Sequence, residues 1–204
     1  MPDRGDSFGG RVLVCQDAPV ADDLTLADIE AASQRLEGVV RRLPVHSARW
    51  LSDRVGGPAF LATENLQRAG SFKIRGAYNR LSQLNESERA VGVVAASAGN
   101  HAQGVALASQ MLGIQATIFM PRSASMPKVT ATRDYGADVR FHGATLDEAL
   151  VEARSFAQET GAIFISPFDH PDIVAGQGTL GLEILEQVPD VRTIVVCTGG
   201  GGLL

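Results

Sequence analysis

The chain has 204 residues and a mass of 21.5 kDa, which is enough to bury a hydrophobic core. Hydrophobic residues make up 45% of it, as in soluble globular proteins, and the formal net charge is -5 with an isoelectric point near 5.3. It contains no basic block or interleaved aromatic platform, so neither nucleic acid nor a membrane is an expected partner.

The N-terminal segment 1–23 mixes Asp, Arg, Gly and Pro with one apolar patch, Val12–Cys15, that is too short and wrongly flanked for a signal peptide. We predict a mobile tail. The two cysteines, Cys15 and Cys197, have neither metal-ligand nor disulfide spacing. This favours a reducing cytosol and predicts no metal site.

Four elements are predicted before residue 90. Thr25 can cap a helix that begins at Leu26 and ends before Pro44, with acidic residues in the first turn where the helix dipole favours them. A short helix over 48–55 is closed by Gly56, and 59–63 is a predicted strand. A further helix begins near Lys73 and runs to about residue 84.

Lys73 lies in the frame Gly70-Ser71-Phe72-Lys73-Ile74-Arg75-Gly76-Ala77, among small and apolar neighbours. Burial disfavours the charged form of an amine, and we expect the neighbouring Arg75 to lower the pKa of Lys73 as well. A neutral amine can form an imine, so Lys73 is a candidate for covalent chemistry. The alternatives are an ordinary exposed lysine, and for Arg75 a scaffold ion pair.

From residue 91 onward, apolar runs and helices alternate. After the run 91–96, Gly113, Gly136 and Gly161 each end an amphipathic helix and are followed at once by the apolar runs 114–120, 137–141 and 162–165. Glycine readily takes the left-handed conformation of a helix C-terminus, and strands that follow helices at this spacing form parallel βαβ units. An α/β fold is therefore predicted.

Two more helices are predicted near the end of the chain, each with an apolar face assigned to the core. The helix 145–160 carries Leu146, Ala149, Leu150, Ala153 and Phe156 on one face, and the helix 172–187 packs Ile173, Leu180, Ile184 and Leu185. Gly176-Gln177-Gly178-Thr179 is interpreted as a helix-entry turn that lets elements pack closely.

Two further segments carry chemistry. Ser97-Ala98-Gly99-Asn100-His101 joins a strand to a helix, a turn whose free N–H groups bind ligands and anions in open α/β sheets. The run 193–198 is a predicted buried strand that delivers Gly199–Gly202, whose amides can converge on a phosphate. A packed histidine at 101 and a flexible glycine segment are the alternatives.

In this order and spacing, the Ser-Phe-Lys, Ser-x-Gly-Asn-His and tetraglycine segments resemble the threonine and serine dehydratases. These are fold type II enzymes that use pyridoxal 5'-phosphate (PLP), like tryptophan synthase β chains, with parallel sheets flanked by helices. The resemblance runs from about Leu24 to the last residue. It implies that Lys73 holds PLP and is the catalytic base. It implies further that Phe72 and Asn100 contact the cofactor, and that Gly199, Gly200, Gly201 and Gly202 bind the phosphate.

The resemblance also assigns Ser97, Gly99, Asn100 and His101 to the substrate carboxylate. It implies β-elimination of L-threonine, with L-serine as a second substrate, to a 2-oxo acid and ammonia. Related serine racemases have a serine at the position of Ala98 as a second acid/base, and a methyl group cannot carry a proton, which favours elimination over racemisation. A cytoplasmic enzyme of amino-acid metabolism, including isoleucine biosynthesis, that is a homo-oligomer when full length is expected.

By the same resemblance, 24–90 and 167–204 belong to a large PLP domain, and 91–166 forms a small mobile α/β domain. The family continues after the glycine loop with elements that these 204 residues lack, so we expect a truncated chain that binds PLP poorly and shows no turnover alone. Two other classes stay open. They are an inert fragment of a PLP enzyme, and a Rossmann-like nucleotide-binding protein, although 199–202 lacks the full dinucleotide fingerprint.

Overall fold

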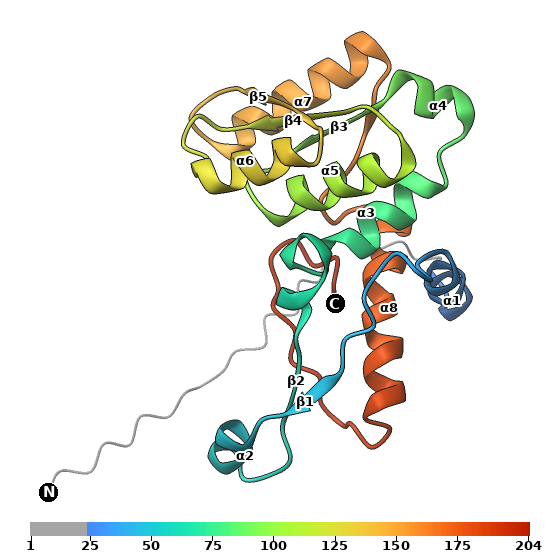
Figure 1. Ribbon diagram of the computed structural model, residues 1–204, viewed down its shortest axis with the longest axis vertical. Helices are drawn as coiled ribbons and strands as arrows, with labels where there is room; N and C mark the ends of the chain where they lie inside the picture. Colours follow the sequence, from blue (N-terminus) through green and yellow to red (C-terminus); the bar gives the residue numbers. More distant parts are fainter. Residues whose placement is uncertain (1–23) are drawn as a thin grey trace, which may run out of the picture.

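The computed structural model describes residues 24–204 (Figure 1). The predicted tail 1–23 lies outside the described residues, as does Cys15. The helices are α1 (Leu26–Arg35), α2 (Arg49–Val55), α3 (Lys73–Ser82), α4 (Glu86–Val91), α5 (Asn100–Leu112), α6 (Met126–Asp134), α7 (Leu146–Thr160) and α8 (Pro171–Gln187). The strands are β1 (Val45–Ser47), β2 (Phe60–Ala62), β3 (Val93–Ala96), β4 (Ala116–Met120), β5 (Asp138–Phe141) and β6 (Ile163–Phe164).

Strands β3 to β6 form one parallel sheet in the order β5-β4-β3-β6. Each strand is linked to the next through a helix, and the left-handed Gly113 and Gly161 end α5 and α7 with φ of +69° and +78°. The predicted α/β fold and parallel sheet are therefore confirmed. The chain first adds strands on one side of β3 and then returns to pair β6 on the other side, so the strand order reverses at β3.

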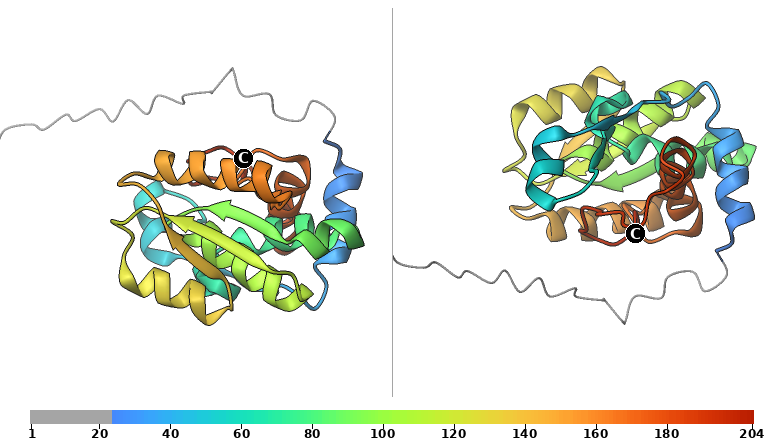
Figure 2. Two further views of the ribbon diagram at one scale, coloured as in Figure 1. Left: turned by 90° about the horizontal axis from the view of Figure 1, so that it is seen from above. Right: turned by 90° about the horizontal axis from the view of Figure 1, so that it is seen from below.

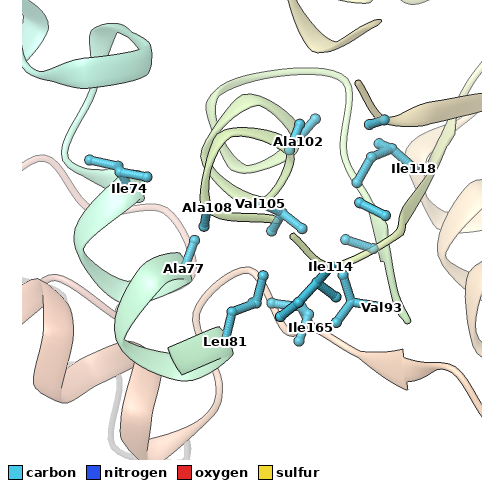
Figure 3. Packing of buried hydrophobic residues seen from close by; sticks show 14 of the residues in the cluster. Ile74, Ala77, Leu81, Val93, Ala102, Val105, Ala108, Ile114, Ile118 and Ile165 are labelled. Carbon is cyan, nitrogen blue, oxygen red and sulfur yellow. The ribbon is translucent and has the colours of Figure 1, made fainter. Parts of the chain in front are cut away.

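The sheet is covered on both faces, and alternate residues of each strand face opposite layers. Val94, Ala96 and Phe119 pack against α7, whereas Val93, Ala95 and Ile118 pack against α5 on the other face. Figure 2 shows these layers from above and below. The second layer continues into α3, whose buried residues Ile74, Ala77 and Leu81 join the same core (Figure 3).

The lower part of Figure 1 holds α1, α8 and an arm formed by β1, β2 and α2. Strands β1 and β2 pair as an antiparallel ribbon, and α2 lies at its end. Helix α1 packs against α8, and its Thr25–Asp28 capping box is formed. Strand β1, helix α4 and the short 3₁₀ turns 64–66 and 68–70 were not predicted. Asn85 and Glu88 form a capping box that marks the start of α4 in the sequence.

Three sequence predictions about packing are wrong. Segment 193–198 is not a strand, because no strand of residues 24–204 lies beside it to complete hydrogen-bonded pairs; Val195 is 93% exposed. Leu146 and Leu185 were assigned to the core but are 48% and 51% exposed. They lie in the first turn of α7 and the last turn of α8, at the ends of these helices.

Helices α3 and α8 cross at glycines. A Cβ on Gly76 would lie 2.7 Å from the Ile173 carbonyl oxygen, and a Cβ on Gly176 would lie 2.6 Å from Gly76 Cα. The segment 176–179 therefore does allow close packing, as predicted, but it lies inside α8 and not at its entry. The two backbones touch where larger residues would hold them apart.

We expect Gly176→Ala to lower the free energy of unfolding by about 1–3 kcal/mol, because the added methyl group overpacks the crossing. Gly181→Ala is the matched control in the same helix, since a Cβ there meets nothing within 4 Å. It should stabilise by about 0.5–1 kcal/mol through helix propensity. Urea denaturation measures both. Equal effects of the two substitutions would contradict the tight crossing.

Candidate active site

The predicted motifs meet at the carboxyl edge of the parallel sheet. The loop after β3 and the connection after β6 leave neighbouring strands at the point where the strand order reverses, which is the usual ligand position in open α/β sheets. Helix α3 begins beside α5: a Cβ on Gly104 would lie 3.2 Å from Lys73 Cβ. The structure therefore brings Lys73 next to the Ser97–His101 loop.

Lys73 is the first residue of α3, and its amine points to the β6–α8 connection. Lys73 Nζ donates to the Pro167 carbonyl at 2.5 Å and lies 5.2 Å from the centroid of the Phe72 ring. Among residues 24–204 no carboxylate pairs with this amine. A half-buried amine held only by a backbone carbonyl is free to react.

Burial lowers the pKa of the Lys73 amine, and the nearby Cys197, when ionised, acts in the opposite direction. The expected direction is therefore correct, but the expected contribution of Arg75 is wrong. The Arg75 guanidinium is buried and binds two carboxylates, Glu64 at 2.8 Å and Glu183 at 2.7 Å. Its charge is compensated there, so Arg75 is the scaffold ion pair that was the alternative.

The turn that precedes Lys73 is stabilised by hydrogen bonds of the Gln67 side chain. Ala69 takes a left-handed conformation with φ of +57°, which is uncommon for a residue with a side chain. Buried Gln67 holds this turn, because its side-chain oxygen accepts from the Arg41 and Arg68 amides at 2.8 and 2.9 Å and its Nε2 donates to the Arg41 carbonyl at 2.8 Å. The start of α3 is thereby fixed.

The Ser97–His101 loop combines buried and exposed groups. Ser97 Oγ accepts from the Gly99 amide at 3.1 Å, and Gly99 is the N-cap residue of α5. Asn100 is exposed and its side chain makes no hydrogen bond within residues 24–204. His101 is buried, and its Nε2 lies 3.1 Å from the Ile165 carbonyl, so this nitrogen carries the proton and donates.

Burial lowers the pKa of His101 to about 4, even though the bond to Ile165 raises it, and the charge of Lys73 lowers it further. The imidazole is therefore neutral at pH 7. His101 is packed against the β6–α8 connection in this structure, and its contact with the substrate carboxylate stays a prediction.

The glycine loop reaches the same connection from the other side. Added side chains at Gly200 or Gly202 would overlap Phe168, the residue after Pro167, whereas Gly199 and Gly201 have nothing within 4 Å. Lys73, the Ser97–His101 loop and Gly199–Gly202 all lie around residues 165–168. Their roles in binding cofactor and substrate stay predictions.

Several residues that shape the site were missed by sequence reasoning. Glu64, Gln67 and Glu183 hold the start of α3, and Pro167 and Phe168 contact the amine and the glycine loop. Glu64 lies in the 3₁₀ turn 64–66, and Gln67 lies between it and the turn 68–70. Their polar side chains shortly before Lys73 were the signal available in the sequence. A carbonyl contact such as that of Pro167 leaves no signal in a sequence.

The donor set fits PLP. A carbonyl cofactor needs an amine with a lowered pKa, and Lys73 supplies one; a phosphate needs backbone close approach, and two of the loop glycines face open space. Asn100 adds a free amide at the start of α5. Fold and site together are those of a fold type II PLP enzyme.

Comparisons with known proteins support the assignment to the PLP-dependent enzymes. The profile of the family "Pyridoxal-phosphate dependent enzyme" matches residues 36–204, so the chain belongs to this family. It is 54% identical over 181 residues to the L-threonine ammonia-lyase of Thermotoga maritima, covering 89% of this chain and 45% of that protein. It is 47% identical over 191 residues to the catabolic L-threonine dehydratase of Escherichia coli, covering 94% and 57%.

Among solved structures, maize serine racemase superposes with a TM-score of 0.84 at 40% identity, over 87% of this chain and 54% of that one. The chain spans about half the length of the curated relatives described above. The family is PLP-dependent, which decides against the Rossmann-like alternative. Within residues 24–204 no helix is long and apolar enough to cross a membrane, and no cluster of three metal-ligating side chains occurs.

The neutral His101 predicts a loss of stability in acid. The unfolded chain protonates this histidine near pH 6.5, whereas the folded protein does so only near pH 4. Between these values the unfolded state binds more protons, so stability falls as the pH falls, in total by on the order of 3 kcal/mol.

His101→Gln keeps a donor for the Ile165 carbonyl and should lose this part of the pH dependence. Chemical denaturation from pH 7 to pH 4 measures it, with His46→Gln as the control because His46 is exposed in β1. An unchanged slope in His101→Gln would contradict a neutral buried imidazole.

Proposed function

We propose that the protein containing this chain is a PLP-dependent ammonia-lyase that converts L-threonine, and L-serine as a second substrate, to a 2-oxo acid and ammonia. The observation that carries the proposal is the convergence of three groups around residues 165–168. Within residues 24–204 they are a lysine amine without a carboxylate partner, a strand-to-helix loop whose Asn100 side chain makes no hydrogen bond, and a glycine loop in which Gly199 and Gly201 face open space.

Lys73 has two tasks in this proposal. Its lowered pKa increases the fraction of neutral amine, which would hold the cofactor carbonyl. Once the amino group of the substrate has displaced it from that carbonyl, the freed Lys73 amine would accept the proton from the substrate α-carbon. When bound, PLP supplies the electron sink for the charge left on that carbon. The braced start of α3 holds Nζ in one place, which is the protein's contribution to proton transfer.

The Ser97–His101 loop is assigned to the substrate. Donors at the start of α5 suit a carboxylate, since the helix N-terminus adds partial positive charge. Phe72, close to the Lys73 amine, is assigned to the cofactor together with Asn100. Gly199–Gly202 are assigned to its phosphate.

Threonine as substrate is supported by the names of the relatives, which include a threonine ammonia-lyase and a threonine dehydratase. Elimination is favoured over racemisation by Ala98, which lies in the loop and offers no proton. The catabolic relative leaves isoleucine biosynthesis as an expectation of the resemblance alone.

Further parts of the proposal concern the whole protein. We assign 24–90 and 167–204 to a large domain and 91–166 to a small mobile one, with the site between them. Self-association is supported by apolar side chains on the arm, since Trp50 and Val55 of α2 are 66% and 62% exposed. A cytoplasmic location follows from the cysteine usage of the sequence.

Borohydride reduction of the complete protein in the presence of PLP should attach the cofactor to Lys73. Within these 204 residues the only other lysine is Lys128, which serves as the comparison. Peptide mapping by mass spectrometry identifies the modified residue, and Lys73→Ala should lose the absorbance band of the linked cofactor while Lys128→Ala keeps it. Modification of Lys128 with an unmodified Lys73 would overturn the assignment.

In the complete protein, Ala98→Ser should add measurable racemisation of serine to elimination, because it supplies a hydroxyl on the second face of the α-carbon. Chiral chromatography of the reaction with L-serine measures D-serine, and Ala98→Gly is the control without a hydroxyl. If Ala98→Ser binds PLP and eliminates normally but forms no D-serine, this position does not control the partition.

A further inference from the structure

The chain uses lysine sparingly. Of its 18 basic residues 16 are arginines, and the two lysines are Lys73 and Lys128. Arginine therefore serves nearly everywhere that a surface cation or ion pair is needed. Lys73 is kept as an amine by the chemistry proposed above, so the second lysine calls for its own explanation. Lysine differs from arginine as a compact point charge on a flexible stem.

The side chain of Lys128 reaches the Ser97–His101 loop, next to which Lys73 also lies. It is in the first turn of α6, which follows β4, the neighbour of β3 in the sheet. Its Nζ lies 3.5 Å from the position that a Cβ on Gly99 would occupy, and Gly99 is the N-cap residue of α5. The amine of Lys128 therefore lies beside Gly99, in the loop that carries Ser97, Asn100 and His101.

Lys128 is exposed, and no charged partner of its amine lies at ion-pair distance within residues 24–204. The amine also makes no hydrogen bond there, and neither α5 nor α6 has an acidic residue in its first turn. His101 is neutral. A cation at a helix N-terminus is electrostatically unfavourable, and Lys128 lies at two of them. Such an arrangement suits an anion that comes from outside the chain.

We propose that Lys128 is a substrate-contact residue whose ammonium group binds the carboxylate of the amino-acid substrate on the Ser97–His101 loop. The proposal rests on the proposed function, because it takes the substrate to be an amino acid held at this loop. Lys128 takes no part in proton transfer. It raises affinity for the substrate and leaves the chemical step to Lys73.

Steady-state kinetics of the complete, PLP-loaded protein test whether Lys128 acts in substrate binding and not in the chemical step. Lys128→Met should raise KM for threonine about tenfold with kcat within about twofold, since a charge-assisted contact is lost. Lys128→Arg should recover part of the affinity. Arg133→Met is the control, because it removes the same charge from the last turn of the same helix, where Arg133 lies over the Phe141 ring. KM should not change there.

A second measurement does not need turnover. Mild acetylation with an amine-reactive ester, followed by mass spectrometry, reports the accessibility of Lys73 and Lys128 separately. L-Alanine, which has no β-leaving group, should protect Lys128, and ethylamine, which lacks the carboxylate, should not.

An unchanged KM in Lys128→Met, or equal protection by both compounds, overturns the proposal. Threonine deamination can persist in that case, so the proposed function would stand. If the wild-type protein forms no 2-oxo acid from threonine, the proposed function fails, while protection by L-alanine still reports on Lys128.

Discussion

Close contact of helix α3 with two other helices fixes the candidate site. On one side, Gly104 of α5 lies against the backbone and Cβ of Lys73; on the other, Gly76 of α3 meets Gly176 of α8. A Cβ would overlap backbone atoms at the contact with α8 and would lie 3.1 Å from the Lys73 carbonyl carbon at the contact with α5. The first residue of α3 therefore cannot shift relative to the start of α5 without separating packed backbones, and the distance between the Lys73 amine and the Ser97–His101 loop depends on these glycines.

The same helix separates two positive charges that lie two residues apart. Successive residues of an α-helix are 100° apart, so Lys73 and Arg75 point about 200° apart. Lys73 faces α5 and the connection to α8, whereas Arg75 faces Glu64 and Glu183. Burial alone would lower the pKa of Arg75, but the two carboxylates raise it and keep the guanidinium charged. One cation is thus compensated and structural, and the other stays available.

The alternation of strands and helices could be predicted from the sequence, because it depends on local signals. Thr25, Asn85 and Thr145 cap helices with partners three residues away, and Gly113 and Gly161 end them. The meeting of Lys73 with the Ser97–His101 loop could be predicted only through the resemblance, since nothing local in either segment specifies the other. The Arg75 ion pairs were beyond reach because Glu183 is 108 residues away. Burial at 193–198 was misjudged because apolar composition alone does not supply a neighbouring strand.

The glycine loop 199–202 requires glycine for two different physical reasons, which are close packing at some positions and backbone conformation at another. Side chains at Gly200 and Gly202 would overlap Phe168, so packing alone excludes larger residues there. Gly199 and Gly201 meet nothing within 4 Å, and Gly201 has φ of +86°, which residues with a Cβ rarely adopt. Four consecutive glycines in a sequence therefore do not by themselves specify a phosphate site. The position of this loop near Pro167, whose carbonyl accepts from the Lys73 amine, is what favours the proposed phosphate role over a merely packed turn.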